Sequence, residues 1–193
     1  IKSNYYMFEI TNHKLSTMRK ILILILFIGI LGCINKKKEQ TSTVKIKDEK
    51  AQKISEMMKS YVNNNLNSSI ISDDAIIKFN KIKMTKTGFE DLVKTHHAMF
   101  SEISFPEGWM ETINYTGNDV KNAGGIYADG YGSTWTSHWS DWTAVSKISG
   151  DTISNPCFFG YKWENDKIIE VNAIFPDEAF NKEFAMFIEA DEK

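Results

Sequence analysis

The residue types best suited to chemistry gather in the segment 135–142, Trp-Thr-Ser-His-Trp-Ser-Asp-Trp. Side chains alternate between the two faces of a β-strand, so Trp139 and Asp141 share one face. A carboxylate surrounded by indole and tyrosine rings has a raised pKa and can act as a general base. Asp141 is therefore the candidate catalytic residue, with Tyr115 or Tyr161 as the hydrogen-bond donor to a substrate. If the same face meets a partner, its aromatic rings form a dimer surface instead.

The last predicted strand, 167–175, carries no proton-transferring group on the face expected to line a cavity. Its alternation places Ile169, Val171, Ala173 and Phe175 together on that face. An apolar wall of this kind favours holding a ligand, or simple core packing, over acid–base catalysis. The predicted ligand-binding residues are Tyr115, Trp139, Asp141, Tyr161, Val171 and Ala173.

The remaining reactive side chains favour structural roles. His96 falls on the apolar stripe of a predicted helix over 88–103, which is typical of a core histidine with one hydrogen bond. Cys157 is expected to be a small buried thiol. The glycine-rich stretch 124–132 lacks a phosphate-binding pattern, and no group of His, Cys and acidic residues has metal-ligand spacing. We therefore expect no metal and no cofactor.

The strongest local signal is the apolar run 21–32, which follows Arg19 and Lys20 and ends at Cys33. A helix of this length rises about 18 Å, whereas the hydrocarbon core of a bilayer is about 30 Å thick. A positive start followed by a short apolar run is typical of a secretory signal peptide. The tetrapeptide Ile30-Leu31-Gly32-Cys33 resembles a bacterial lipobox, in which the cysteine receives the lipid. The alternatives are a buried helix and an uncleaved anchor.

The lipobox interpretation divides the chain into four parts. Residues 1–17 lie upstream of the natural start at Met18, residues 18–32 are the signal peptide, residues 33–50 form a polar tether, and residues 51–190 form the folded domain. We expect the mature protein to be held at a membrane of the bacterial cell envelope by acyl chains on Cys33.

Composition and periodicity indicate one α+β domain. The chain has 193 residues with 23 basic and 25 acidic side chains, a balance that gives no indication of nucleic-acid binding. Helices are predicted over 51–62 and 88–103, the second behind a capping box at Thr87 and Glu90. Strands are predicted over 75–84, 109–116, 133–147, 156–163 and 167–175, followed by a helix from Asp177. The short connections imply an antiparallel sheet with the helices on one face.

Two short parts of the chain carry a family likeness. One is the segment 161–170, Tyr-Lys-Trp-Glu-Asn-Asp-Lys-Ile-Ile-Glu, which closes on Phe175-Pro176-Asp177. The other is the helix from Gly88 to His96 with its exit at Phe105-Pro106-Glu107. Both resemble the SnoaL-like branch of the nuclear transport factor two-like superfamily. Over residues 51–190 the resemblance implies a cone-shaped, cystatin-like roll, in which a strongly curved antiparallel sheet wraps around N-terminal helices. It also implies a cavity at the wide end and dimerisation through the sheet.

The resemblance does not carry the family's cyclase activity to this chain. In the polyketide cyclases of that branch the final strand has an acidic residue two positions after a histidine, and the matching positions here are Val171 and Ala173. The sequence therefore predicts a lipid-anchored envelope protein that binds a small hydrophobic ligand. One alternative is an isomerase, dehydratase or cyclase-type enzyme with Asp141 as general base. The other is a structural or dimerisation module.

Overall fold

The computed structural model describes residues 42–115 and 133–191. Both ranges belong to one compact unit. The predicted upstream extension (1–17), signal peptide (18–32), Cys33 and glycine-rich stretch (124–132) lie outside the described residues. None of the helices within the described ranges has the length and apolar character needed to cross a membrane.

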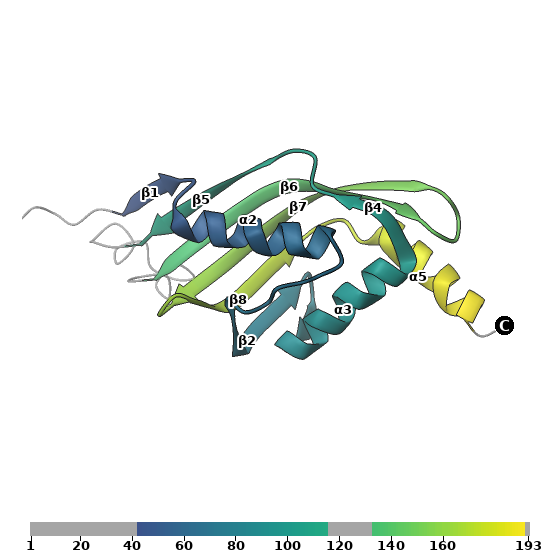
Figure 1. Ribbon diagram of the computed structural model, residues 1–193, viewed down its shortest axis with the longest axis horizontal. Coiled ribbons are helices and arrows are strands. Elements are labelled where there is room, and N and C mark those ends of the chain that lie inside the picture. Colours follow the sequence, from purple (N-terminus) through teal and green to yellow (C-terminus); the bar gives the residue numbers. More distant parts are fainter. Residues whose placement is uncertain (1–41, 116–132, 192–193) are drawn as a thin grey trace, which may run out of the picture. The chain divides into compact units, whose positions relative to one another are not determined.

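The described ranges contain three helices and eight strands. Figure 1 shows how they are arranged. The helices are α2 (Glu49–Val62), α3 (Lys86–Met99) and α5 (Glu178–Asp191). The strands are β1 (Thr43–Ile46), β2 (Ile71–Phe79), β3 (Ile82–Met84), β4 (Phe100–Ser104), β5 (Gly108–Asn114), β6 (Thr134–Ser146), β7 (Thr152–Glu164) and β8 (Lys167–Ile174). The predicted α+β class is confirmed.

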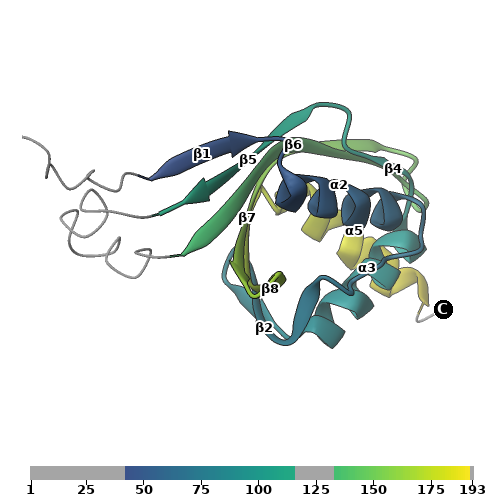
Figure 2. The same ribbon diagram turned by 60° about the vertical axis from the view of Figure 1, so that its left-hand side comes forward.

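The strands form one sheet in the order β1-β5-β6-β7-β8-β2-β3, with β4 paired to β6. Figure 2 shows this sheet curving around α2 and α3. The prediction of a wholly antiparallel sheet is wrong at one pair, because β2 runs parallel to β8 with Ile77 opposite Val171. The strand β2 comes before the meander in the chain but inserts beside its last strand, so the sheet is mixed.

The folded domain begins before the expected boundary at residue 51. Residues 43–46 form β1, which pairs with β5, and Asp48 caps the N-terminus of α2. The Asp48 carboxylate accepts hydrogen bonds from the Ala51 backbone N–H at 3.0 Å and from the Thr112 hydroxyl at 2.7 Å. The end of the predicted tether is therefore structured, because its Thr-Val-Lys-Ile run suits an edge strand.

The helix α3 is shorter than predicted and starts earlier. Its N-cap is Thr85, whose hydroxyl accepts from the Gly88 N–H at 3.2 Å, rather than Thr87 of the expected capping box. The helix ends at Met99, and the chain continues directly as β4, which pairs with the end of β6. The apolar stripe that suggested one helix to residue 103 is thus shared by a helix and a strand.

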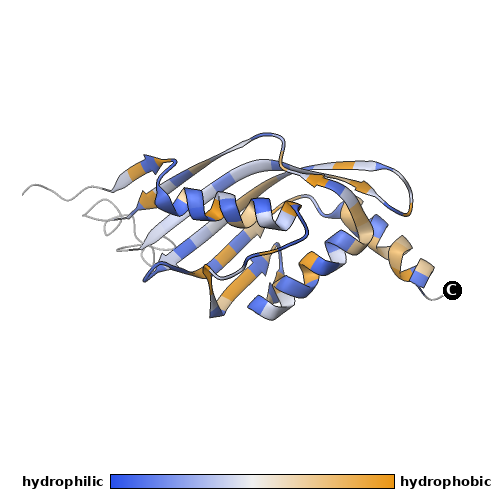
Figure 3. Ribbon diagram, viewed as in Figure 1, coloured by the Kyte–Doolittle hydropathy of each residue, from blue (hydrophilic) through white to orange (hydrophobic). Residues whose placement is uncertain are grey.

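The inner face of the sheet is set by strand alternation and by one bulge. On β6 the inward residues are Thr136, His138, Ser140, Trp142, Ala144 and Ser146. On β8 a register shift opposite Lys162 and Trp163 brings Ile168 inward, where strict alternation predicted Ile169. Val171 and Ala173 point inward as predicted. Figure 3 shows hydrophobic and hydrophilic residues alternating along α2 and α3, as expected for helices with one buried face.

Candidate functional site

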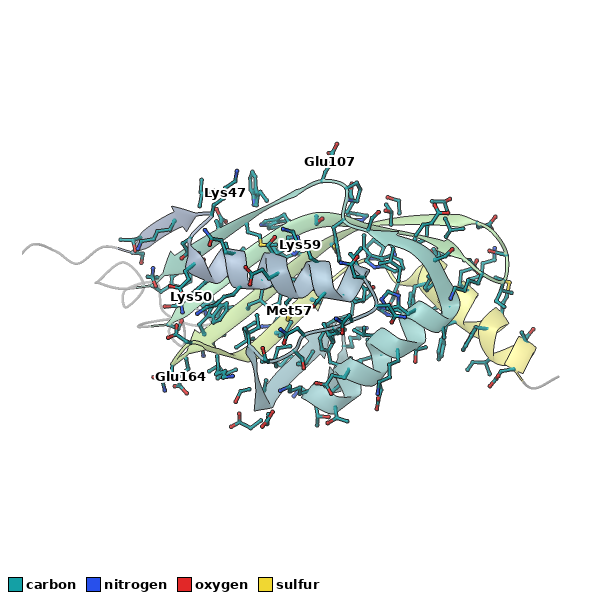
Figure 4. The ribbon with its side chains drawn as sticks, viewed as in Figure 1. Lys47, Lys50, Met57, Lys59, Glu107 and Glu164 are labelled. Carbon is teal, nitrogen blue, oxygen red and sulfur yellow. The ribbon has the colours of Figure 1, made fainter. Side chains whose placement is uncertain are left out.

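A cavity of about 860 Å³ is lined by side chains from the sheet, from α2 and α3, and from the start of α5. Most of these side chains are apolar, and Met57 of α2, labelled in Figure 4, is one of them. The charged lining residues Lys81, Asp91 and Asp177 are exposed, so they mark the opening toward solvent. A cavity of this volume and lining is typical of a site for a small organic molecule.

The residues predicted to bind a ligand separate into two groups. Tyr161 and Val171 line the cavity. Ala173 is buried on the same inner face of β8 but is not part of the lining. Tyr115 follows the end of β5, where its backbone N–H donates to the Ser133 carbonyl at 3.0 Å, and it is also outside the lining.

The assignment of Trp139 and Asp141 to the cavity wall is corrected by the structure. Both lie on the outer face of β6, since the opposite face carries Trp142 and the other buried residues. The Trp139 side chain is 49% exposed and packs on Phe158, with ring centroids 4.5 Å apart. Asp141 therefore does not face the cavity and is not placed to act as a base there.

A hydrogen-bonded cluster around Tyr61 forms one wall of the cavity. The indole Nε1 of Trp142 donates to the Tyr61 hydroxyl at 2.8 Å, and that hydroxyl lies 3.0 Å from Nδ1 of His96. The imidazole Nε2 of His97 donates to the Tyr61 carbonyl at 2.6 Å. The hydroxyl hydrogen of Tyr61 finds a partner when it is donated to His96, so Nδ1 of His96 accepts and its Nε2 carries the proton.

Burial holds two histidines neutral. The pKa of His96 is lowered from 6.5 to about 4, chiefly by desolvation and further by the neighbouring His97. Desolvation also lowers the pKa of His138 to about 4. The ring of His138 stacks on Phe159, and its Nδ1 has no hydrogen-bond partner within the described ranges. Both imidazoles are therefore uncharged near neutral pH.

Two further buried groups in the wall, Cys157 and Tyr161, are also held in their uncharged forms. Desolvation raises the pKa of the Cys157 thiol to about 12, and its Sγ donates to the Ser140 carbonyl at 3.1 Å. Desolvation raises the pKa of Tyr161 well above its usual value, and its hydroxyl has no partner among the described side and main chains. Cys157 is the buried thiol that the sequence predicted, and its neutral form is a poor nucleophile.

Asn155 is a lining residue that sequence reasoning missed. It is 8% exposed and lies on the inner face of β7, in line with Cys157, Phe159 and Tyr161. The predicted strand began at Pro156, one residue too late to include it. Extending the alternation of that strand toward the N-terminus would have found it.

The outer face of the sheet carries an exposed apolar row. Trp109, Trp139, Phe158 and Ile174 are consecutive register partners across β5, β6, β7 and β8. Elsewhere on this face Lys78 and Glu170 form an ion pair at 2.6 Å. Partial burial would raise the pKa of Glu170, but the hydrogen bonds from Lys78 and Asn172 outweigh it and lower that pKa. Glu170 and Asn172 thus point away from the cavity, as predicted.

The comparisons with known proteins show a likeness in fold alone. No family model matches the sequence, and no curated protein is significantly similar to it. A proposed isomerase from Bacillus subtilis has a TM-score of 0.48 and 11% identity, over 72% of this chain and 94% of its own. A proposed SnoaL-like polyketide cyclase from Shewanella denitrificans OS-217 has a TM-score of 0.47 and 8% identity, over 72% and 98%.

A third similar structure is a hypothetical protein with a ketosteroid isomerase-like fold from Catenulispora acidiphila DSM 44928, in complex with trimethylamine. Its TM-score is 0.43 and its identity 9%, over 62% of this chain and 82% of that one. At such identities and TM-scores, these likenesses say nothing about the activity of this chain, so its function rests on its own cavity.

Proposed function

We propose that the domain holds a small, uncharged, hydrophobic ligand in the cavity beneath its curved sheet. The observation that carries this proposal is the combination of a volume of about 860 Å³ with a mainly apolar lining. Apolar ligand surface gains roughly 25 cal/mol per Å² when it leaves water for such a site.

The electrostatics of the wall also support an uncharged ligand. His96, Cys157 and Tyr161 are all held in their neutral forms by burial. A charged ligand group placed among them would lose its hydration without gaining a counter-ion. The charged lining residues lie at the exposed opening, where they stay hydrated.

The test is binding of N-phenyl-1-naphthylamine, whose fluorescence rises in apolar surroundings, to the full chain in lipid nanodiscs, with empty nanodiscs subtracted. We expect saturable binding that Val171→Trp weakens, because the indole projects into the cavity and displaces part of the ligand volume. Ile76→Trp, at an exposed position on the outer face of the neighbouring strand, is the matched control and should bind normally. Native mass spectrometry of the wild-type protein gives a second measurement that does not depend on the variant folding. Absence of saturable probe binding to the wild-type protein contradicts the proposal.

The chain is proposed to act at a membrane through acyl chains on Cys33. This part rests on the positive start, the apolar run 21–32 and the lipobox-like Ile30-Leu31-Gly32-Cys33. The test is expression in bacteria with a labelled fatty acid. The wild-type chain should carry the label and sediment with membranes, and Cys33→Ser should carry none. Equal labelling of both chains would contradict a lipid on Cys33.

The exposed apolar row on the outer face favours a second role, association with another copy of the chain. Trp109 and Ile174 at its two ends are each 64% exposed, and Trp139 between them is 49% exposed. Contiguous aromatic surface of this kind is typical of protein interfaces. Ile174 also borders the cavity, whereas Trp109, Trp139 and Phe158 are not among its lining residues, so a dimer through the aromatic part of the row is compatible with ligand binding.

A further inference from the structure

One part of the cavity wall is polar, and it lies beside Trp142. Asn155 is the register partner of Trp142 on the adjacent strand β7, so their Cβ atoms are about 5 Å apart. His96 approaches the same indole from α3, with ring centroids 5.9 Å apart. Both Asn155 and His96 line the cavity. Two elements far apart in the sequence thus bring an amide and an imidazole beside the same aromatic ring in the cavity wall.

The side-chain amide of Asn155 and the Nε2 atom of His96 do not take part in the hydrogen bonds that hold the described fold together. Neither the side-chain amide of Asn155 nor Nε2 of His96 makes a hydrogen bond within the ranges 42–115 and 133–191, and neither is among the enclosed unpaired atoms, which are His138 Nδ1 and the Tyr161 hydroxyl. Both are therefore accessible from the cavity that the two residues line. Because Tyr61 occupies Nδ1 of His96, the free Nε2 presents an N–H group. The pair therefore offers two donors, the His96 Nε2–H and the Asn155 Nδ2–H.

We propose that Asn155 and His96 recognise a carbonyl oxygen at one end of an otherwise apolar ligand. A carbonyl oxygen has two lone pairs and can accept from both donors at once. The surroundings favour an uncharged oxygen over a charged group, because the rings of Phe180 and Trp142 lie 5.2 Å and 5.9 Å from that of His96 and offer no counter-ion. This inference rests on the proposed function and adds the chemical class of the ligand.

The probes are benzophenone and diphenylmethane, which have nearly the same shape and differ in one carbonyl group. Each competes with N-phenyl-1-naphthylamine for the full chain in nanodiscs. We expect benzophenone to compete at about tenfold lower concentration, because it satisfies buried donors that diphenylmethane leaves unpaired. Asn155→Leu should reduce this preference to about threefold or less while both compounds still compete.

A matched control and a spectroscopic readout complete the test. Asn172→Leu makes the same chemical change on the outer face of β8 and should keep the full preference for benzophenone. His96→Asn removes the Nε2–H and retains an oxygen acceptor for Tyr61, so it should also weaken the preference. The infrared carbonyl stretch of bound benzophenone should lie at lower wavenumber in the wild-type protein than in Asn155→Leu, since hydrogen bonding weakens the C=O bond.

The outcomes separate this inference from the proposed function. Equal competition by the two compounds against the wild-type protein, with no shift of the carbonyl band, overturns the inference and leaves the apolar cavity as a binding site. A preference that persists fully in Asn155→Leu overturns it as well, because another donor such as Tyr161 then binds the oxygen. Absence of saturable probe binding overturns the proposed function itself. If Asn155→Leu does not fold, the wild-type preference and band position together with His96→Asn decide.

Discussion

Two tyrosines in the same cavity wall, Tyr61 on α2 and Tyr161 on β7, are both buried but differ in their partners. The Tyr61 hydroxyl accepts from Trp142 and contacts His96, which joins a helix, a strand and a second helix. The Tyr161 hydroxyl has no hydrogen-bond partner among the described residues. The ring of Tyr161 stacks on the ring of Phe159. Burial alone therefore does not reveal the role of a polar side chain. Its set of partners distinguishes a structural link from an unpaired group.

Acidification is expected to weaken both sides of this comparison, because His96 contacts Tyr61 and His138 stacks on Phe159, the neighbour of Tyr161. The pKa of His96 and of His138 falls from 6.5 in the unfolded chain to about 4 in the folded one. Between pH 6.5 and pH 4 the unfolded chain binds more protons, so stability decreases as pH falls through this window. The loss reaches about 3 kcal/mol for each histidine at pH 4.

Urea unfolding at a series of pH values between 7 and 4 measures this dependence. The His96→Asn variant has no imidazole at this position, so its free energy of unfolding should fall less steeply with decreasing pH. The contribution of His138 to that dependence should remain. An identical pH dependence in the variant and the wild-type protein would show that His96 is not the buried titrating group.

Tyr61→Phe tests the bonded side of the comparison directly. Removing the hydroxyl leaves the Trp142 Nε1–H and the His96 Nδ1 without their partner in a buried place. We expect the free energy of unfolding to fall by about 2 kcal/mol. Chemical denaturation at pH 7 measures it, and a loss indistinguishable from zero would mean that the cluster contributes nothing to stability.

Tyr161→Phe should act in the opposite direction. The variant removes a buried hydroxyl that makes no hydrogen bond, and the ring remains packed on Phe159. We expect the ligand-free protein to become more stable by about 1 kcal/mol. The same denaturation experiment, run beside Tyr61→Phe, gives the two changes under one condition. Destabilisation of the same size in both variants would remove the distinction between the two tyrosines.

Much of the fold could be predicted because local patterns and global packing agree. The aromatic and β-branched runs gave the long strands, and the Asn165-Asp166 pair gave the hairpin turn, where both residues have positive φ. The parallel pairing of β2 with β8 could not be predicted, because it joins strands about 90 residues apart and leaves no local mark. The bulge that turns Ile168 inward is equally invisible to strict alternation.

The site was harder to predict than the fold for a physical reason. Alternation shows which residues of β6 share a face, but both of its faces carry tryptophan, so composition does not say which face turns inward. Trp139 and Asp141 were assigned inward on their chemistry, whereas the packing of α2 and α3 buries the face of Trp142. Asn155 was missed because Pro156, which usually ends or begins a strand, lies inside β7 at an exposed position.

The same comparison applies to two tryptophans of β6. The outer one, Trp139, is expected to contribute less to folding stability than the inner one, Trp142. Trp142 donates its indole N–H inside the protein, while Trp139 is half exposed beside Phe158. Trp139→Ser should lower the free energy of unfolding of the monomer by only about 1 kcal/mol, the contribution of its cross-strand pair with Phe158. If the outer row mediates association, sedimentation velocity should show that the Trp139→Ser variant shifts from dimer toward monomer. Ile148→Ser, at an exposed apolar position in the turn between β6 and β7, is the control and should leave the association state unchanged. A wild-type chain that sediments as a monomer at all concentrations would assign the row no role in self-association, and Trp139 would then be a surface residue without a counterpart to Trp142.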